Sequence, residues 1–427
     1  MRLVVENFAK IKHADLEFDG ITVLAGKNNT GKSTIGKIVF ALFFSMYRMG
    51  NKILNERKAE VLGNFRLLLE NVLKTYADNT IKYQQGRPPR QSDKFFSIMM
   101  DPQINTKDEF LRQLYAFAKN VSGLDIKKLD INYEELEKKA DAIWNIPDEK
   151  MAQGIMEEVF KEIFTYQINS ILQPDTCAKA RMTIKQHDIS IDFRDNECIF
   201  FHSDVEIANH VIYIDDPFLI DHVMKQGMSS TIQQRCIAYL EENRPPTIAS
   251  KLLAEEKLSK VYDMLGSVIS GKLIMREDSN GLFLQQQGLA EELNVTNLSA
   301  GLKSFAILKR LLENGTLRER DVLILDEPEI HLHPEWQLRY AELIVLLQKT
   351  FDLTILLTTH SPFFLDAIEI FSAKHEIADK LHYYLSKQGE HSVAFENVTN
   401  HIDRIYEQMS EPIQLLENMR SELQMGR

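Results

Sequence analysis

The chain has 427 residues, of which 44% are hydrophobic and 26% are charged. This length exceeds that of one average domain, and the composition is ordinary for globular protein with a sizeable core. The formal net charge of -12 disfavours attraction of the whole molecule to nucleic acid or to an anionic membrane, although it leaves room for a local basic groove.

Cysteine use and the N-terminal sequence bear on the cellular compartment. The three cysteines form no C-x-x-C pair, so they indicate neither a disulfide framework nor a zinc site and fit a reducing compartment. Glu6, Lys10 and Lys12 interrupt the N-terminal stretch before it contains the apolar core of a signal peptide. No apolar run reaches the roughly 18 residues of a membrane-spanning helix. We therefore expect a cytoplasmic protein with no membrane partner.

The first elements surround a glycine-rich loop. Alternating apolar residues predict strands over 3–8, 14–18 and 21–25, and an apolar run predicts a helix over 35–46. Between the last strand and the helix lies the pattern G-x-x-x-x-G-K-[ST], which in this context wraps backbone N–H groups around phosphates at the positive end of a helix dipole. The sequence therefore predicts a nucleoside triphosphate site. The residues expected to bind the nucleotide are Gly26, Asn28, Asn29, Thr30, Gly31, Lys32, Ser33 and Thr34.

Four residues of this loop have specific expected roles. Lys32 is expected to reach the β- and γ-phosphates, and Ser33 is expected to ligate Mg²⁺. Gly26 and Gly31 permit positive φ angles and a close approach of the backbone to phosphate, which a Cβ atom would hinder.

The sequence pattern becomes helical after the first helix. Apolar residues recur at i, i+3, i+4 and i+7 over 61–76, 110–121 and 151–168, which predicts the packing faces of a helical subdomain. Heptads are not sustained for long enough to indicate a long coiled coil. Residues 84–94 include Arg-Pro-Pro-Arg, and they fit either a solvated loop or a contact with a phosphate backbone.

Strand patterns return from about residue 180, and strands and helices then alternate as they do in an α/β sheet. The expected strands are 182–185, 189–193, 198–202, 211–215, 322–325 and 353–359; helices are expected over parts of 218–265, 307–312 and 335–348, and a hairpin over 272–286.

Two carboxylates follow the expected strand 322–325. Asp326 and Glu327 come directly after four apolar residues, and a buried parallel strand delivers both to the sheet edge where phosphate sites lie. We expect Asp326 to hold the Mg²⁺ shell, and Glu327 to orient the attacking water and accept its proton. Asp215 and Asp216 also end a strand, but we prefer Asp326 because a glutamate follows it.

Two further segments fit a phosphate site less specifically. In the segment LSAGLK, Ser299 suits the N-cap of a helix and Gly301 its first turn, so the segment is either an anion site with added charge from Lys303 or a simple helix cap. His360 follows the expected strand 353–359. It can bond a γ-phosphate oxygen, or it can serve as a structural histidine.

In this order, the segments GKNNTGKST, LSAGLK, LILDEPEIHLHPEWQ and TTHSP resemble those of ABC-type ATPases (AAA family) of the SMC, RecF and OLD group. The opening MRLVVENFAKIKHADLEF is also similar to the N-terminus of that group. The resemblance covers about residues 1–45 and 295–370. It implies an α/β P-loop NTPase fold of the ABC-ATPase type, a mixed sheet with flanking helices, carrying a large helical insertion.

The resemblance also implies a discontinuous ATPase domain. The expected parts are an N-terminal lobe with the Walker A motif over 1–50, a helical insertion over 51–178, the remainder with signature, Walker B and H-loop over 179–400, and a helical tail over 401–427. The tail is amphipathic, and it fits a docking helix and core packing equally well.

The implied mechanism uses ATP and Mg²⁺ in a head-to-tail dimer that forms with ATP. One chain would contribute the catalytic residues Glu327, His360 and Lys32 with the metal ligands Ser33 and Asp326, and the other chain would contribute Ser299 and Gly301.

The sequence departs from the family in one respect that bears on function. OLD-type nucleases carry a Toprim domain after the ATPase, and residues 361–427 are too few for one. We therefore expect a stand-alone ATPase that regulates a separate effector such as a nuclease, or acts on DNA, in phage defence or DNA repair. Septu-like and retron-associated antiphage ATPases are the closest analogy. The alternatives are a non-hydrolysing ATP-stabilised scaffold, a DNA repair ATPase of RecF type, and a nuclease with its own carboxylates.

Overall fold

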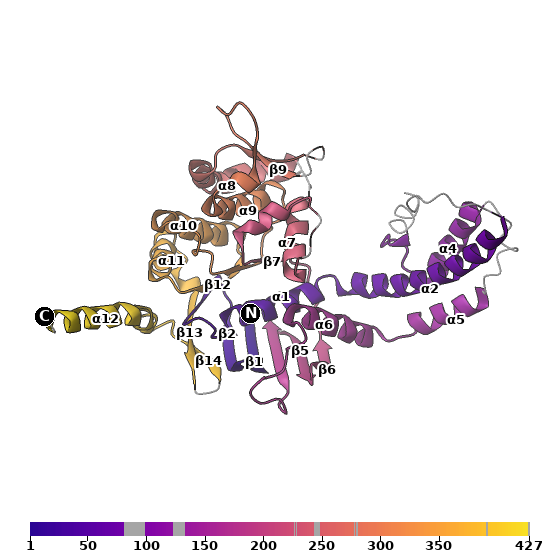
Figure 1. Ribbon diagram of the computed structural model, residues 1–427, viewed down its shortest axis with the longest axis horizontal. Helices are drawn as coiled ribbons and strands as arrows, with labels where there is room; N and C mark the ends of the chain where they lie inside the picture. Colours follow the sequence, from indigo (N-terminus) through magenta and orange to yellow (C-terminus); the bar gives the residue numbers. More distant parts are fainter. Residues whose placement is uncertain are drawn as a thin grey trace. The chain divides into compact units, whose positions relative to one another are not determined.

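The computed structural model describes residues 1–80, 99–122, 133–225, 227, 229–242, 248–276, 278, 281–389 and 392–425. The chain forms two compact units: the first combines Met1–Tyr47 with Met156–Arg427, and the second is Arg48–Ile155 (Figure 1). The basic loop expected over 84–94 lies outside the described residues.

A mixed sheet organises the first unit. Its eleven described strands run in the order β6-β5-β4-β1-β2-β14-β13-β3-β12-β11-β7. The strands from β6 to β2 pair antiparallel, whereas β13, β3, β12, β11 and β7 form a parallel block. The bounds are β1 Arg2–Phe8, β2 Ile11–Glu17, β3 Ile21–Ala25, β4 Ala178–Ile184, β5 His187–Arg194, β6 Glu197–Ser203, β7 Val211–Ile214, β11 Val322–Asp326, β12 Thr354–Thr359, β13 Leu381–Gln388 and β14 Val393–Asn397.

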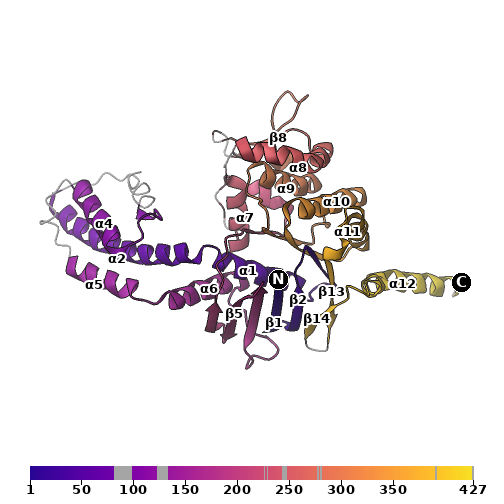
Figure 2. The ribbon, with the colours of Figure 1, turned by 180° about the vertical axis from the view of Figure 1, so that it is seen from behind.

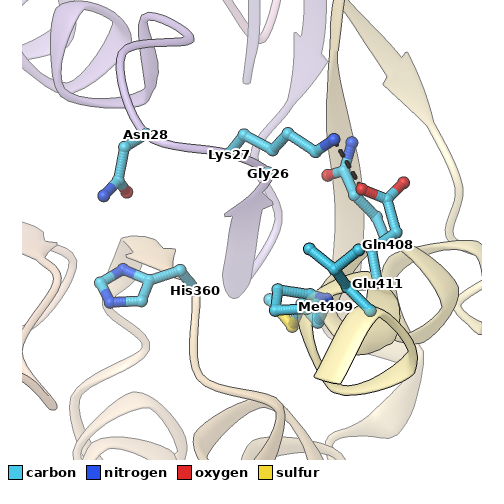
Figure 3. Close-up of a pocket in the computed structure, with 9 residues that line it drawn as sticks. Gly26, Lys27, Asn28, His360, Gln408, Met409 and Glu411 are labelled. Carbon is cyan, nitrogen blue, oxygen red and sulfur yellow. Dashed lines mark ion pairs between the residues drawn. The ribbon is translucent and has the colours of Figure 1, made fainter. Parts of the chain in front are cut away.

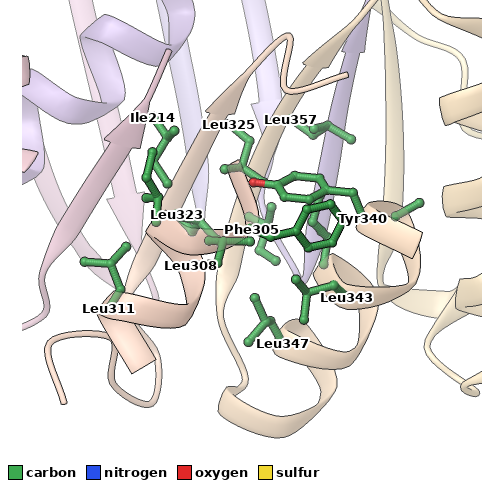
Figure 4. Packing of buried hydrophobic residues seen from close by; sticks show 14 of the residues in the cluster. Ile214, Phe305, Leu308, Leu311, Leu323, Leu325, Tyr340, Leu343, Leu347 and Leu357 are labelled. Carbon is green, nitrogen blue, oxygen red and sulfur yellow. The ribbon is translucent and has the colours of Figure 1, made fainter. Parts of the chain in front are cut away.

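The parallel strands are near-continuous apolar runs, as expected for strands buried on both faces. One face, which carries Leu325 and Leu357, packs against α9 (Ala300–Glu313) and α10 (Pro334–Phe351), and Figure 4 shows Phe305 and Tyr340 of these helices in that core. This layer is the main hydrophobic core of the unit.

The opposite face packs against α1 (Lys32–Met46), the helix that follows the glycine-rich loop. A Cβ atom on Gly36 would lie 3.0 Å from Cε2 of Tyr213 and 3.2 Å from Cγ2 of Ile324, so α1 approaches the sheet closely at this residue. Helices thus cover both faces, and the carboxyl ends of β3, β12, β11 and β7 meet at one edge. The predicted fold class, a mixed α/β sheet with flanking helices, is confirmed.

The remaining elements of the first unit surround α9 and α10. The expected hairpin is present as β8 and β9, which β10 extends to a second, small antiparallel sheet. The bounds are η2 Pro217–His222, α7 Thr231–Glu241, α8 Ile248–Val268, β8 Lys272–Arg276, β9 Gly281–Gln285, β10 Leu293–Asn294, η3 Val295–Asn297, α11 Pro362–Lys374 and η4 Ala378–Lys380.

The second unit is helical. It contains α2 (Met49–Thr80), α4 (Lys107–Ser122), α5 (Tyr133–Trp144) and the first residues of α6 (Asp148–Phe164). Their apolar stripes meet in a small core of Val61, Leu62, Phe65, Met99, Ile104, Phe110, Leu111, Leu114, Leu136 and Ala140.

The second unit ends earlier than the helical insertion that we expected over 51–178. The rings of Phe164 and Phe160, both on α6, lie 4.9 Å and 6.1 Å from the ring of Phe8 on β1. The carbonyl of Ile168 accepts a hydrogen bond from the backbone N–H of Ala9 at 2.9 Å. Residues from 156 onward therefore pack with the sheet.

The C-terminal helix α12 (Asp403–Met425) is buried only at its start. Ile405 is fully buried in the main core, whereas every side chain over 411–424 is exposed. The ribbon shows α12 as the last element of the chain, beyond β13 and β14 (Figure 2). Core packing therefore accounts for the first turns alone. The exposed apolar residues beyond them are Ile413, Leu415, Leu416, Met419 and Leu423. Within the described residues, no helix is long and apolar enough to cross a membrane.

Candidate functional site

The loop between β3 and α1 adopts a conformation that requires its glycines. Gly26 has a φ of 143° and Gly31 a φ of 81°, both in the range that favours glycine. A Cβ atom on Gly26 would lie 1.8 Å from Oγ of Ser386, and that hydroxyl donates to Oγ1 of Thr30 at 2.7 Å. Gly31 is the N-cap of α1, so the loop leads into a helix N-terminus, which attracts phosphate through free backbone N–H groups and the helix dipole.

The other loop residues lie around this turn. Asn29 also has a positive φ, and its Oδ1 accepts a hydrogen bond of 2.8 Å from Nζ of Lys10. Asn28 is exposed, and Thr34 is half-buried in the first turn of α1.

The Lys32 ammonium lies inside the loop. Its Nζ donates to the carbonyl oxygens of Gly26 at 2.9 Å and Lys27 at 3.0 Å, and it lies 3.7 Å from Oε1 of Glu327. Burial lowers the pKa of Lys32, and the charges of Glu327 and Asp326 oppose that shift. The lysine is therefore held by neutral carbonyls and faces a carboxylate, an arrangement from which it can turn to an incoming phosphate.

The Asp326 carboxylate, at the end of β11, accepts hydrogen bonds from three hydroxyl groups. Oδ1 accepts from Ser33 at 3.2 Å and from Thr358 at 2.5 Å, and Oδ2 accepts from Tyr213 at 2.8 Å. The parallel register explains this convergence because Asp326 is paired with Thr358 on β12, and Ile214 on β7 is paired with the residue before Asp326. The neighbouring oxygens of Ser33 and Asp326 are the hard ligands that Mg²⁺ prefers, so these residues fit the ion.

Glu327 stands between the glycine-rich loop and the end of β12. Its φ of 49° is uncommon for a residue with a side chain, and its N–H donates to both the carbonyl oxygen and Oγ1 of Thr358, at 3.2 and 2.9 Å. Its Oε1 lies 3.3 Å from Nδ1 of His360. The structure therefore brings one carboxylate within reach of both Lys32 and His360.

The segment LSAGLK begins α9. Ser299 is an exposed N-cap whose Oγ accepts a hydrogen bond of 3.4 Å from the N–H of Leu302. A Cβ atom on Gly301 would lie 3.0 Å from Cε3 of Trp336, so glycine permits close packing of α9 against α10. Lys303 is buried and its Nζ donates to Asp221 at 2.6 Å, so its charge is engaged inside the unit.

The structure brings most, but not all, of the expected site residues together. The loop, Asp326, Glu327 and His360 meet at one sheet edge. Ser299 and Gly301 begin a helix that packs on η2, α7, α8 and β8, whereas α1 packs on β7, β11 and β12. Asp215 directly follows β7, next to β11, and burial with the charge of Asp326 raises the pKa of its carboxyl.

Sequence reasoning missed three residues of this edge. Tyr213, Thr358 and Glu329 all bond groups of the site. Tyr213 and Thr358 could have been noticed as polar residues inside apolar strands. Glu329 could have been noticed as an acidic residue two positions after Glu327.

A pocket of about 470 Å³ opens beside the loop. Gly26, Lys27, Asn28 and His360 line one side, and residues of α12 line the other (Figure 3). Nζ of Lys27 and Oε2 of Glu411 are 2.6 Å apart, which joins the loop to α12 by an exposed ion pair. The α12 residues at the pocket are Gln408, Met409, Glu411, Pro412 and Leu415.

Comparison with known proteins gives one family match and several similar structures. Residues 198–366 match the model of an AAA domain described as a putative AbiEii toxin of a type IV toxin–antitoxin system. An SMC head domain from Thermotoga maritima is 9% identical with a TM-score of 0.40 and covers 93% of this chain and 98% of that one. An SMC head bound to the C-terminal winged-helix domain of ScpA is 10% identical with a TM-score of 0.43, covering 93% and 96%. An SMC head with an extended coiled coil, bound to the C-terminal domain of ScpA derived from Pyrococcus furiosus, is 10% identical with a TM-score of 0.33, covering 98% of both.

The strand order, the conformation of the glycine-rich loop and the partial family match agree on the class of fold. The matched range contains LSAGLK, Asp326, Glu327 and His360, and the glycine-rich loop precedes it in the chain. The first unit therefore has the mixed α/β fold of a P-loop nucleotide-binding domain, and its residues 198–366 are similar to an AAA domain.

Proposed function

We propose that this chain hydrolyses ATP and that ATP closes two copies into a head-to-tail dimer which controls a separate effector. The position of Glu327 carries this proposal. Its carboxylate lies 3.7 Å from the Lys32 ammonium and 3.3 Å from the His360 ring, beside the hydroxyl and carboxylate of Ser33 and Asp326. A general base, a phosphate-binding cation and metal-binding oxygens within this distance suit phosphoryl transfer to water.

Each residue has a defined task in this mechanism. Lys32 exchanges its loop carbonyls for the β- and γ-phosphate oxygens, and His360 donates to a γ-phosphate oxygen. Glu327 accepts the proton of the attacking water. Ser33 and Asp326 would hold Mg²⁺, which when bound offsets the charge of the phosphates.

The exposed position of Ser299 supports the shared site. The α9 N-terminus, with free N–H groups and a positive dipole, has the chemistry of a γ-phosphate ligand. Yet α9 packs on the sheet face opposite α1, the helix into which the glycine-rich loop leads. A second copy supplies the missing ligand most simply, with Ser299 and Gly301 of one chain closing the ATP site of the other.

The effector is proposed as a separate nuclease, in phage defence or DNA repair, with DNA as a further candidate partner. The family match supports the defence role because its description names a toxin–antitoxin system. The net charge of -12 favours control of a protein partner over direct binding of nucleic acid. An ATP-stabilised scaffold without turnover is the second candidate. It is favoured by the exposed apolar residues of α12 between Ile413 and Leu423, which a further protein surface could cover.

Light scattering with Mg-ATP tests the shared site. Wild type, Glu327→Gln, and Glu327→Gln with Ser299→Arg are compared with and without nucleotide. We expect a dimer or larger assembly only with ATP, accumulation of that assembly in Glu327→Gln, and its loss when Ser299→Arg is added. A molecular mass that is the same with and without ATP in all three proteins would contradict the dimer proposal.

A further inference from the structure

Glu329 is a buried carboxyl on the segment between β11 and α10. Its side chain is 2% exposed. Oε1 accepts a hydrogen bond of 2.5 Å from Oγ1 of Thr359 and one of 3.2 Å from the backbone N–H of His360. Oε2 is buried and bonds no other described residue. Burial raises the pKa of this carboxyl, as expected where solvent is excluded.

This arrangement is poor for stability alone. A buried polar atom without a partner carries its full desolvation cost, and an apolar residue of similar volume would avoid it. A carboxyl in such a place is better explained by the two groups that it does hold, both of which belong to the segment that presents His360.

A second bridge supports the same segment. Oε1 of Gln337, on α10, accepts a hydrogen bond of 3.1 Å from Oγ of Ser361, and its Nε2 donates to the carbonyl oxygen of Leu332 at 3.2 Å. The backbone N–H of Ser361 also donates to Oγ1 of Thr359 at 3.1 Å. The residues on both sides of His360 are therefore fixed to the chain that follows β11.

His360 itself is less constrained. Its side chain is 42% exposed and meets Glu327 at 3.3 Å. Because much of the side chain is open to solvent, we expect the backbone at His360 to set where the imidazole points. Loss of the Glu329 carboxylate removes the acceptor of the His360 N–H directly.

We infer that Glu329 is a positioning residue, which holds the backbone at Thr359 and His360 so that the imidazole meets Glu327 and the terminal phosphate. This inference rests on the proposed ATP hydrolysis. Glu329 acts through His360, from whose backbone N–H it accepts a hydrogen bond.

Steady-state ATP hydrolysis by Glu329→Ala and Glu329→Gln tests the inference. Gln keeps the volume and one acceptor oxygen, so we expect its kcat to stay within about threefold of wild type. Ala loses both hydrogen bonds, and we expect kcat to fall at least about tenfold while KM changes less than about threefold. Glu342→Ala is the matched control because Glu342 pairs with Lys374 and His375 away from the site, and its kcat should not change.

A double-mutant cycle separates positioning from general damage. Because Glu329 acts through His360, Glu329→Ala combined with His360→Ala should be no slower than His360→Ala alone. A double variant slowed by the product of the two single effects would overturn the inference, as would an unchanged kcat in Glu329→Ala or a Gln variant as slow as Ala.

An NMR measurement makes the test independent of turnover. The His360 ring resonance, assigned with His360→Gln, should move in Glu329→Ala and stay in place in Glu329→Gln. A wild type that binds ATP and releases no phosphate would refute the proposed function alone, and the ring resonance would then decide the role of Glu329. A resonance unmoved by Glu329→Ala would overturn the positioning role.

Discussion

Removal of one buried hydroxyl beside Asp326 should weaken the folded state by a calculable amount. Tyr213 is fully buried, and its hydroxyl donates to Oδ2 of Asp326 at 2.8 Å. Tyr213→Phe keeps the ring and its packing, so the cavity cost is small. Hydrogen bonds to charged groups contribute about 1.5–3 kcal/mol, and water reaches the half-buried Asp326 to replace part of the loss. We therefore expect a destabilisation of about 1–2 kcal/mol.

Tyr383, on β13 of the same sheet, provides a matched control. Its hydroxyl is also buried, and none of the described residues gives it a hydrogen-bond partner. Tyr383→Phe removes an uncompensated polar group, so the change should be neutral or stabilising by up to about 1 kcal/mol.

Urea unfolding followed by circular dichroism measures both variants, with unchanged m-values as the check that only stability has altered. Equal destabilisation in Tyr213→Phe and Tyr383→Phe would refute the reasoning, because it would mean that the bond to Asp326 contributes nothing particular.

Two further predictions concern pH and backbone shape. Burial raises the pKa of Asp321 to about 6 and lowers that of His210 to about 4. Because the folded chain holds the Asp321 proton more tightly than the unfolded chain, Asp321 lowers stability as pH rises from about 4 to 6. Because the unfolded chain protonates His210 more readily than the folded chain, His210 raises stability as pH rises from about 4 to 6.5. The two slopes oppose, so Asp321→Asn should increase the rise of unfolding free energy with pH in this window, and an unchanged profile would contradict the assignment. Gly26→Ala should lower the free energy of unfolding by at least about 2 kcal/mol and remove most nucleotide affinity, because of the φ of Gly26 and the 1.8 Å approach to Ser386. Gly154→Ala, in a helix with open space around it, should stabilise the chain by about 0.5–1 kcal/mol. Thermal unfolding and nucleotide titration measure both variants, and equal effects would refute the geometric argument.

Part of the candidate site could be predicted because its residues are close together in the sequence, within short motifs. The glycine-rich loop and the pair Asp326 and Glu327 each follow a buried parallel strand, and such strands end at one sheet edge. His360 follows the strand between them. Three separate segments were therefore expected to converge, and their backbone positions do so.

The supporting residues could not be predicted in the same way. Tyr213 looks like any aromatic residue in a core strand until the register places it beside Asp326. The role of Glu329 depends on a contact with β12, 30 residues further along the chain. Apolar periodicity also does not tell which element a helix packs against. The apolar residues of α6 predicted a helix, but not that Phe160 and Phe164 pack on β1. For α12, only the structure separates buried Ile405 from the exposed residues after it.

Phosphate release from Mg-ATP, measured with wild type and Glu327→Gln beside a direct measurement of ATP binding, tests the central claim most directly. If Glu327 is the general base at this site, the wild type turns over, and Glu327→Gln binds ATP with similar affinity while its kcat falls at least about a hundredfold. Equal rates in the two proteins, or ATP binding without any phosphate release by wild type, would contradict the hydrolytic role and favour an ATP-stabilised scaffold.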